Sequence, residues 1–171
     1  QLLAYAGKGR FMVESLDLSR TVREMTELLH ASIPKKVNLK LALGSRLPGI
    51  EADRGQLQQV VMNLVINAAE AIGTNRTGTV TISTRAQEVS ETGRISDEIT
   101  GGSLAPGKYV CFEVADTGCG MDKETRARIF EPFYTTKFMG RGLGLAAVAG
   151  IVQAHHGAIQ LETAPGRGST F

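Results

Sequence analysis

The chain has 171 residues, a hydrophobic share of 42% and a formal net charge of +2. These values fit one domain with a buried core, and the scattered basic residues form no Lys/Arg run typical of nucleic-acid sites, so we expect no nucleic-acid partner. No apolar stretch approaches the roughly 18 residues of a membrane-spanning helix, and no signal-peptide pattern opens the chain. The two cysteines form no disulfide framework, so we expect a cytoplasmic domain, whose full-length parent can still be membrane-anchored.

Hydrophobic periodicity, capping residues and turn residues divide the chain into helices and strands. In chain order we expect a helix over 1–8, a strand over 11–18, a helix that Ser19 caps and that continues to Pro34, a strand over 37–43, a helix over 53–72, strands over 79–86 and 108–115, a short helix over 123–129, a helix over 143–156, a strand over 158–163, and a turn at 165–168 before a last strand. Residues 87–107 are polar and rich in glycine and serine, and we expect a long hairpin loop there.

The order of these elements predicts an α+β fold. Strands that follow each other without a crossover helix imply a mixed, mostly antiparallel sheet, and three helices with apolar stripes would cover one face of it as a two-layer sandwich. We expect residues 1–10 to be the end of a helix from a preceding domain. Residues 11–171 would form the main domain, with its last strand cut short.

The helix over 53–72 carries two stripes at helical spacing. Leu57, Val61, Leu64, Ala68 and Ile72 form an apolar stripe, which predicts packing against the core. A polar stripe follows a different side of the same helix: Gln56, Gln59, Asn63, Asn67 and Glu70. Asparagine is unfavourable inside a helix because its amide competes with the backbone. The stripe is either solvent-facing or the wall of a polar cleft, where an amide oxygen can coordinate Mg²⁺ without repelling phosphates.

Two glycine clusters flank a stretch without regular periodicity. Residues 116–121 have the sequence Asp-Thr-Gly-Cys-Gly-Met after a predicted strand, and residues 140–145 have Gly-Arg-Gly-Leu-Gly-Leu before a predicted helix. Glycine has no Cβ, so the backbone at these positions can approach a ligand closely. The two clusters predict a nucleotide pocket with a movable cover.

Three common nucleotide sites are excluded by their spacing. The chain has no Gly-x-x-x-x-Gly-Lys-Ser/Thr P-loop. In a dinucleotide fingerprint that begins at Gly118, Lys123 would stand where glycine or alanine is required, and the second cluster does not follow a strand. A protein-kinase site would need a His-Arg-Asp catalytic loop, which the sequence lacks.

Five motifs in order resemble the catalytic domain of sensor histidine kinases, in the GHKL superfamily. Asn63 and Asn67 resemble the N box, Asp116–Gly120 the G1 box, 130–137 (Phe-Glu-Pro-Phe-Tyr-Thr-Thr-Lys) the F box, 140–145 the G2 box, and 165–171 the closing glycine-rich turn. The resemblance covers residues 11–171. The Phe-Tyr-Thr-Thr-Lys segment is similar to that of nitrogen-regulation and hybrid PAS-linked kinases.

The resemblance implies an ATP site with Mg²⁺. Asp116 would accept a hydrogen bond from the adenine amine, although an Asp before Thr-Gly is also common as a plain turn residue. Asn67 would be the Mg²⁺ ligand, with Asn63 beside it. Glu70 stands where some relatives carry a basic residue, so it is not expected to contact phosphate. The ATP-binding residues would be Asn63, Asn67, Asp116, Gly118, Gly120, Met121, Lys137, Arg141, Gly142, Leu143, Gly144 and Leu145.

The stretch between the clusters, residues 121–141, would be an ATP lid. Lys137 is the candidate cationic contact to phosphate and, with Asn63, a candidate catalytic residue. Thr135 and Thr136 could add hydroxyls, and Phe130 and Phe133 are expected to anchor the lid by burying aromatic surface. Gly142 and Gly144 would let N–H groups at the start of the following helix meet the phosphates.

The histidines and cysteines favour structural roles. His30 and the pair His155 and His156 lie near predicted helix ends, where a histidine is favourable with the helix dipole. Adjacent helical residues point about 100° apart, which makes His155 and His156 a poor metal pair. Cys111 and Cys119 lack the spacing of a metal site.

In the resembled family, the γ-phosphoryl group of ATP passes to a histidine on a separate dimerisation domain. That domain would precede Gln1, so we expect this fragment to be monomeric, to bind Mg-ATP and not to phosphorylate itself. The full-length protein would be a homodimer that acts on a response regulator. Two alternatives stay open: an ATP-hydrolysing relative of the superfamily, and a non-catalytic module that binds nucleotide.

Overall fold

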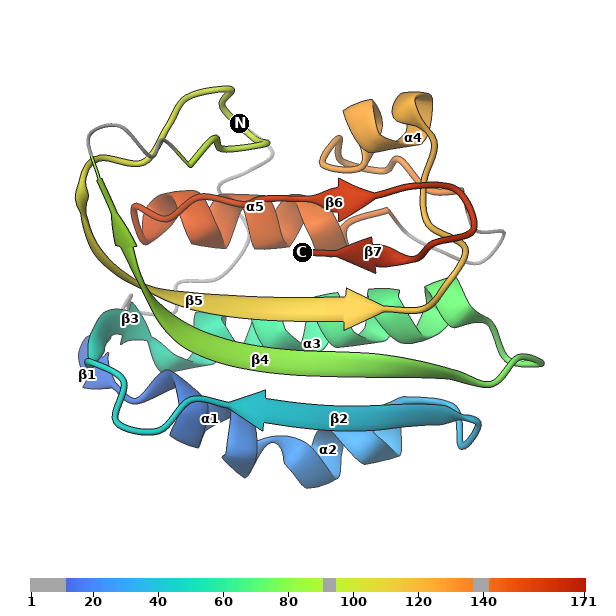
Figure 1. Cartoon of the computed structure of the whole chain (residues 1–171), viewed down its shortest axis with the longest axis horizontal. Coiled ribbons are helices and arrows are strands. Elements are labelled where there is room, and N and C mark those ends of the chain that lie inside the picture. The colour runs from blue at the N-terminus through green and yellow to red at the C-terminus, as the bar shows by residue number, and fades with distance from the viewer. Residues whose placement is uncertain (1–11, 91–94, 137–141) are drawn as a thin grey trace.

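The computed structural model describes residues 12–90, 95–136 and 142–171. Its main sheet has five strands in the order β2-β4-β5-β7-β6, where β2 and β4 are parallel and the other pairs are antiparallel (Figure 1). The strands are β2 (Val37–Leu43), β4 (Gly78–Val89), β5 (Gly107–Asp116), β6 (Glu162–Thr163) and β7 (Ser169–Thr170). The mixed, mostly antiparallel sheet is confirmed.

Helices cover one face of this sheet and form the second layer (Figure 1). They are α1 (Leu18–Glu24), α2 (Thr26–Ser32), α3 (Arg54–Ile72) and α5 (Gly144–Ala154), while the short α4 (Lys123–Arg128) lies beyond the β6 edge. The core between the layers includes Val61 and Val65 of α3, Val80 and Ile82 of β4, Val114 of β5 and Val148 of α5, all less than 2% exposed. The predicted two-layer fold is therefore confirmed.

The apolar stripe of α3 packs as predicted. Val61, Leu64, Ala68 and Ile72 are buried and Leu57 is partly buried against the same core. Asp53 caps the helix, because its carboxylate accepts a hydrogen bond from the Gln56 N–H at 2.9 Å. Three such bonds to backbone N–H groups, the strongest from Gln56, hold the pKa of Asp53 below its usual value.

The predicted helix from Ser19 to Pro34 is divided, and its cap is wrong. The helix breaks at Met25 into α1 and α2, and Asp17 is the N-cap, with its carboxylate 3.0 Å from the Arg20 N–H. Ser19 is buried inside α1, where its hydroxyl donates to the carbonyl of Gly44 and bonds the hydroxyl of Thr84. Aspartate and serine are both favourable N-cap residues. Because its buried hydrogen bonds hold Ser19 inside α1, Asp17 is the cap.

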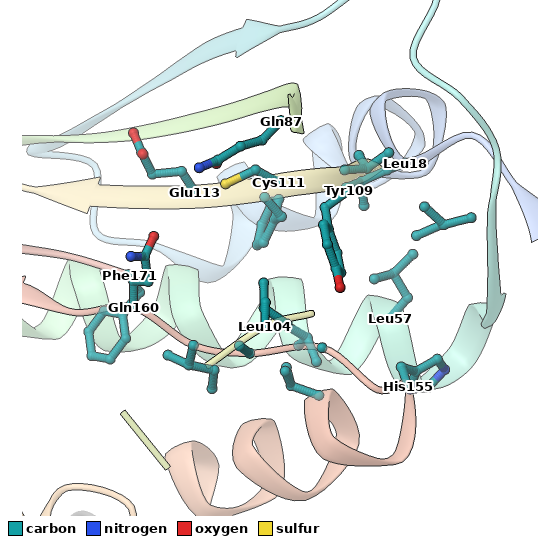
Figure 2. Close-up of a pocket in the computed structure, with 18 of the residues that line it drawn as sticks. Leu18, Leu57, Gln87, Leu104, Tyr109, Cys111, Glu113, His155, Gln160 and Phe171 are labelled. Atoms are coloured by element: carbon teal, nitrogen blue, oxygen red, sulfur yellow. The ribbon is translucent and has the colours of Figure 1, made fainter. Parts of the chain in front are cut away.

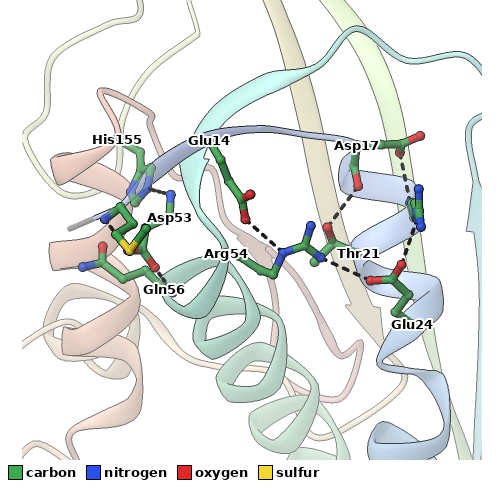
Figure 3. Close-up of polar contacts among 10 residues, drawn as sticks. Glu14, Asp17, Thr21, Glu24, Asp53, Arg54, Gln56 and His155 are labelled. Atoms are coloured by element: carbon green, nitrogen blue, oxygen red, sulfur yellow. Dashed lines mark hydrogen bonds and ion pairs between the residues drawn. The ribbon is translucent and has the colours of Figure 1, made fainter. Parts of the chain in front are cut away.

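A second, two-stranded sheet was not predicted in this form. β1 (Val13–Leu16), shorter than the expected strand over 11–18, pairs antiparallel with β3 (Ile50–Asp53), which sequence periodicity missed because it is only four residues long. Arg54, at the start of α3, bonds Glu14 of β1 and Glu24 of α1 (Figure 3). These ion pairs are half-exposed, so they fix geometry more than they add stability.

The long loop is shorter than predicted, and the strand before β6 is reduced. β4 continues to Val89, and Ser96 and Ser103 form a bridge inside the loop. Of the strand expected over 158–163, only Glu162 and Thr163 pair as β6. In the part of the chain that the structure describes, no helix is both long enough and apolar enough to cross a membrane.

Candidate nucleotide-binding site

The middle of the polar stripe of α3, at Asn63 and Asn67, faces the start of α5, whereas Gln59 and Glu70 of the same stripe are exposed. Asn63 and Asn67 are half-buried, and the side-chain amide of Asn63 donates to the carbonyl of Gly144 at 3.3 Å. A Cβ built on Gly144 would lie 3.6 Å from the Nδ2 of Asn67 and 3.7 Å from the Oδ1 of Asn63. The structure therefore joins two motifs 81 residues apart into one polar cleft, which we call the asparagine cleft (Asn63, Asn67 and Gly144).

The N-terminus of α5 opens into the asparagine cleft without a side-chain cap. Asp17, Asp53 and Asp122 cap α1, α3 and α4 with a carboxylate, whereas Leu143 precedes α5 and makes no capping hydrogen bond. The first turn of α5 also has no acidic residue. The N–H groups at a helix start have no partner within the helix and favour an anion, so this end of α5 is suited to phosphate.

Asp116 is the last residue of β5, one residue beyond the predicted strand, and it is buried. Its Oδ1 accepts a hydrogen bond from the Gly118 N–H at 2.7 Å, which closes a tight turn. A Cβ on Gly118 would lie 2.6 Å from the carbonyl carbon of Ala71, and the Cys119 N–H donates to the carbonyl oxygen of the same residue. The absence of a side chain at Gly118 thus lets the turn pack directly on α3, one helical turn beyond Asn67.

A glycine-rich turn supports the Asp116 segment from the other side. Gly168 has a φ of +75°, and a Cβ there would lie 1.9 Å from the carbonyl oxygen of Asp116. The hydroxyl of Thr163 accepts from the Met121 N–H at 2.9 Å and donates to the carbonyl of Gly168 at 3.1 Å. Sequence reasoning missed Thr163, and the Pro-Gly-Arg-Gly turn after it was the available signal.

The lid segment begins with α4, and one of its two predicted aromatic anchors is wrong. Phe130 is partly buried against the core, as expected, but Phe133 is 76% exposed. Phe133 instead contributes its backbone, since its N–H donates to the carbonyl of Gly142 at 2.8 Å. Gly142 has a φ of +63°, and a Cβ on it would lie 2.5 Å from the carbonyl carbon of Phe133. This contact holds Phe133, within the lid segment, close to Gly142, which follows that segment in the sequence.

Several predicted lid residues cannot be placed. Lys137, Gly140 and Arg141 lie outside the described residues. Thr135 and Thr136 are exposed, Leu143 is exposed, and Leu145 packs against the core.

Near the lid start, hydrogen bonds from Thr125 hold the pKa of Asp122 below its usual value.

His155 has a structural role, as expected. Its Nε2 accepts from the Asp53 N–H at 3.0 Å and its Nδ1 lies 2.8 Å from the carbonyl of Ile151 (Figure 3). A backbone N–H only donates and a carbonyl only accepts, so this geometry requires neutral His155 with its proton on Nδ1. The imidazole thus ties the end of α5 to the start of α3. His30 and His156 are exposed.

The donor set fits magnesium bound mainly by phosphates. Among the described residues, no group of three or more His, Cys, Asp or Glu side chains could hold a metal. Mg²⁺ commonly takes one or two protein oxygen ligands and completes its shell with phosphates and water. The amide oxygen of Asn67, beside the uncapped start of α5, meets that requirement. Cys111 is half-buried, and burial raises the pKa of its thiol, so it is no reactive thiolate.

A family model described as histidine kinase-, DNA gyrase B- and HSP90-like ATPase matches residues 52–171. The chain belongs to this family. It is 36% identical to the sensor kinase CckA of Brucella abortus, over all of this chain and 18% of that protein. It is 33% identical to the histidine-protein kinase AtoS of Escherichia coli, over all of this chain and 25% of AtoS. The chain therefore spans about a fifth to a quarter of these relatives.

Solved structures agree with the fold and the family. The structure of full-length ShkA in complex with AMPPNP has a TM-score of 0.72 and 31% identity, over 97% of this chain and 31% of that one. The catalytic domain of histidine kinase ThkA has a TM-score of 0.67 and 26% identity, over 94% and 92% of the two chains. ThkA in complex with the response regulator protein TrrA has a TM-score of 0.70 and 26% identity, over 99% and 43%. The chain is an ATP-binding domain of the sensor histidine kinase type, and the nitrogen-regulation subtype stays a prediction.

Proposed function

We propose that this domain binds Mg-ATP and supplies the γ-phosphoryl group to a histidine on a separate dimerisation domain. The observation that carries the proposal is the asparagine cleft at the uncapped start of α5. Neutral amides beside the first N–H groups of a helix suit a polyphosphate, because they offer hydrogen-bond donors and a metal ligand without negative charge. The solved structures that support nucleotide binding include full-length ShkA in complex with AMPPNP.

Each end of the nucleotide has a candidate partner. The carboxylate of Asp116 accepts from the Gly118 N–H through Oδ1, and because an ionised carboxylate can accept several hydrogen bonds, it would also accept from the adenine amine. Backbone groups of Gly118, Gly120 and Met121 would line the base. At the other end, Asn63, Gly142, Leu143, Gly144 and Leu145 would surround the phosphates with Lys137 and Arg141 from the lid. Bound Mg²⁺ at Asn67 would neutralise phosphate charge during transfer.

The site favours phosphotransfer over hydrolysis. ATP-hydrolysing members of the superfamily place a glutamate, which acts as the general base, one helical turn before the asparagine that binds magnesium. This chain has Asn63 at that position. An amide has no basicity to activate water, so we expect slow steady-state hydrolysis. Fast ATP turnover that Asn63→Ala abolishes would favour the ATPase alternative.

The partners follow from the kinase proposal. The phosphoacceptor histidine would lie on the protein's own dimerisation domain, the full-length protein would be a homodimer, and a response regulator would receive the phosphoryl group, as the ThkA complex with TrrA suggests. We expect the domain alone to phosphorylate a supplied dimerisation domain but not itself. Acid-labile phosphohistidine on the domain alone would contradict this expectation.

Asp116→Asn tests the adenine assignment. The variant can keep its oxygen toward the Gly118 N–H, but it replaces the second carboxylate oxygen with an NH₂ group that cannot accept from the adenine amine. A lost hydrogen bond to a charged group is worth about 1.5–3 kcal/mol, so calorimetry with Mg-AMPPNP should show roughly 10- to 150-fold weaker binding.

Asp17→Asn is the matched control, because it makes the same change at the distant cap of α1, where asparagine caps as well as aspartate. Its affinity for AMPPNP should equal that of the parent. If Asp116→Asn also binds as tightly as the parent, Asp116 does not recognise adenine. A non-catalytic module would show normal nucleotide affinity but no transfer to any supplied dimerisation domain.

A further inference from the structure

The loop between β4 and β5 folds back on itself as a small hairpin. Ser96 and Ser103 form an antiparallel bridge, and the N–H of Leu104 donates to the carbonyl of Ile95 at 3.0 Å. We call residues 95–104 the loop hairpin. Figure 1 shows it beyond the β6 edge of the sheet, on the same side as α4. None of its residues is among those proposed to bind ATP, so the ATP site does not account for its order.

Asp97 docks the loop hairpin on the segment between α5 and β6. Asp97 is 7% exposed. Its Oδ1 accepts from the N–H of Ile159 at 3.0 Å, and its Oδ2 accepts from the Thr100 hydroxyl at 2.8 Å. The carbonyl of Ile159 in turn accepts from the N–H of Glu98 at 2.8 Å. These bonds fix the backbone of Glu98, so its side chain projects from a rigid base.

The second leg of the loop hairpin is anchored on the sandwich. Leu104 lines a cavity of about 440 Å³ that residues of β5, α3 and α5 also line, and Figure 2 shows it there with Tyr109 and Leu57. The hydroxyl of Tyr109 donates to the carbonyl of Ala105 at 2.9 Å. Both legs of the hairpin therefore bear on the body of the domain, and the hairpin can support an element that packs less well.

The short helix α4 is such an element. It has six residues and none of them is buried. The guanidinium of Arg126 donates from Nε to the Oε2 of Glu98 at 3.3 Å, and from Nη2 to the Oε1. A two-bond pair of this kind fixes direction as well as distance. In the described part of the chain, the other polar contacts of the α4 side chains are with residues 122–134, so Glu98 is what ties them to the body.

The position of α4 matters to the nucleotide because this helix joins the adenine segment to the rest of the lid. Before α4, Met121 donates to Thr163 at the end of the segment proposed to line adenine. After α4, Ile129 is buried. The two ends of the helix are thus held by the body, and Arg126 holds its middle. A loss of that tie would let α4 shift between its ends and carry the lid segment with it.

We propose that Glu98 is a positioning residue for nucleotide binding, an inference that rests on the proposed function. Through Arg126 it holds α4 in the orientation in which the adenine segment and the lid segment meet Mg-ATP together. Without the ion pair, α4 would leave this orientation part of the time, and the apparent Kd rises as the binding-competent fraction falls. The side chains of Arg126 and Glu98 are 40% and 25% exposed, and a pair of this kind limits the effect to about two- to fivefold.

Three variants test the ion pair: Glu98→Gln, Arg126→Glu, and the reversed pair that combines Glu98→Arg with Arg126→Glu. Glu98→Gln should raise Kd for Mg-AMPPNP about two- to fivefold and speed amide exchange at Thr125 and Arg126 of the unliganded domain by a similar factor. Arg126→Glu should do at least as much, because two carboxylates then face each other. The reversed pair should return both quantities to the parent's values. Glu113→Gln is the matched control, because it breaks a similar pair with Arg85 on the sheet, and it should change neither.

Faster exchange in α4 with an unchanged Kd would make the ion pair a purely structural contact and overturn the proposal. A reversed pair that binds as weakly as Arg126→Glu would overturn it as well, because Arg126 would then act on the nucleotide directly. A parent domain that binds no Mg-AMPPNP would instead refute the proposed function itself. The two failures are distinguishable, because the first requires a parent that binds, and the exchange rates report on the ion pair without nucleotide.

Discussion

Replacing Gly144 with alanine separates nucleotide binding from fold stability. A Cβ on Gly144 would meet the amides of Asn63 and Asn67 at 3.6–3.8 Å, which is ordinary van der Waals contact, and the residue lies at the first position of α5 without a positive φ. Alanine is also a better helix former than glycine. The unliganded Gly144→Ala domain should therefore be at least as stable as the parent.

The added methyl group would nevertheless occupy the asparagine cleft. Phosphate oxygens could then no longer approach the start of α5 and the two amides together. Loss of one hydrogen bond to a charged group costs about 1.5–3 kcal/mol, so Kd for Mg-AMPPNP should rise roughly 10- to 150-fold. Calorimetry gives Kd, and thermal unfolding without nucleotide gives Tm.

Gly150→Ala is the matched control within the same helix. Gly150 is exposed, and a Cβ there would meet nothing within 4 Å. Glycine to alanine in a helix interior is worth about 0.8–1.0 kcal/mol, which for a chain of this size raises Tm by about 2–4 °C. Gly150→Ala should show this gain with unchanged nucleotide affinity. If Gly144→Ala binds AMPPNP as tightly as Gly150→Ala, the phosphates do not lie at the start of α5, and the reasoning is refuted.

Two further predictions concern stability. Burial raises the pKa of Asp97, but hydrogen bonds from Ile159, Ile99 and Thr100 outweigh burial and leave the pKa below the usual 3.8. The ionised carboxylate therefore stabilises the fold above about pH 4, and this stabilisation declines as the pH falls through the lower folded pKa. Urea unfolding should show Asp97→Asn less stable than the parent at pH 7, with a smaller difference at pH 3, and an equal difference at both pH values would contradict this. His155→Leu should lower the free energy of unfolding by about 1–3 kcal/mol, because it leaves the Asp53 N–H without an acceptor. The control His156→Asn should unfold like the parent, since His156 is exposed and asparagine tolerates its φ of +55°. Equal urea midpoints for His155→Leu and the parent would show that this hydrogen bond adds no stability.

The sequence by itself determined the two-layer fold class and led to the chemistry that we propose for the site. Periods of two and near 3.6 placed the central strands and α3, because burial of one face imposes those periods wherever an element is long enough. The asparagine stripe was visible because asparagine conflicts with helix propensity, so its presence required another reason. The two glycine clusters were visible by their residue type, whereas Asp116, which a plain turn also favours, was singled out only by the order of the motifs around it.

Only the tertiary structure decided which residues meet. β3 escaped prediction because four residues are too few for a period, and Ser19 was mistaken for a cap because its partners, Gly44 and Thr84, are distant in sequence. Aromatic side chains are usually buried, yet the side chain of Phe133 is exposed, because the backbone hydrogen bond to Gly142 holds this residue at the surface.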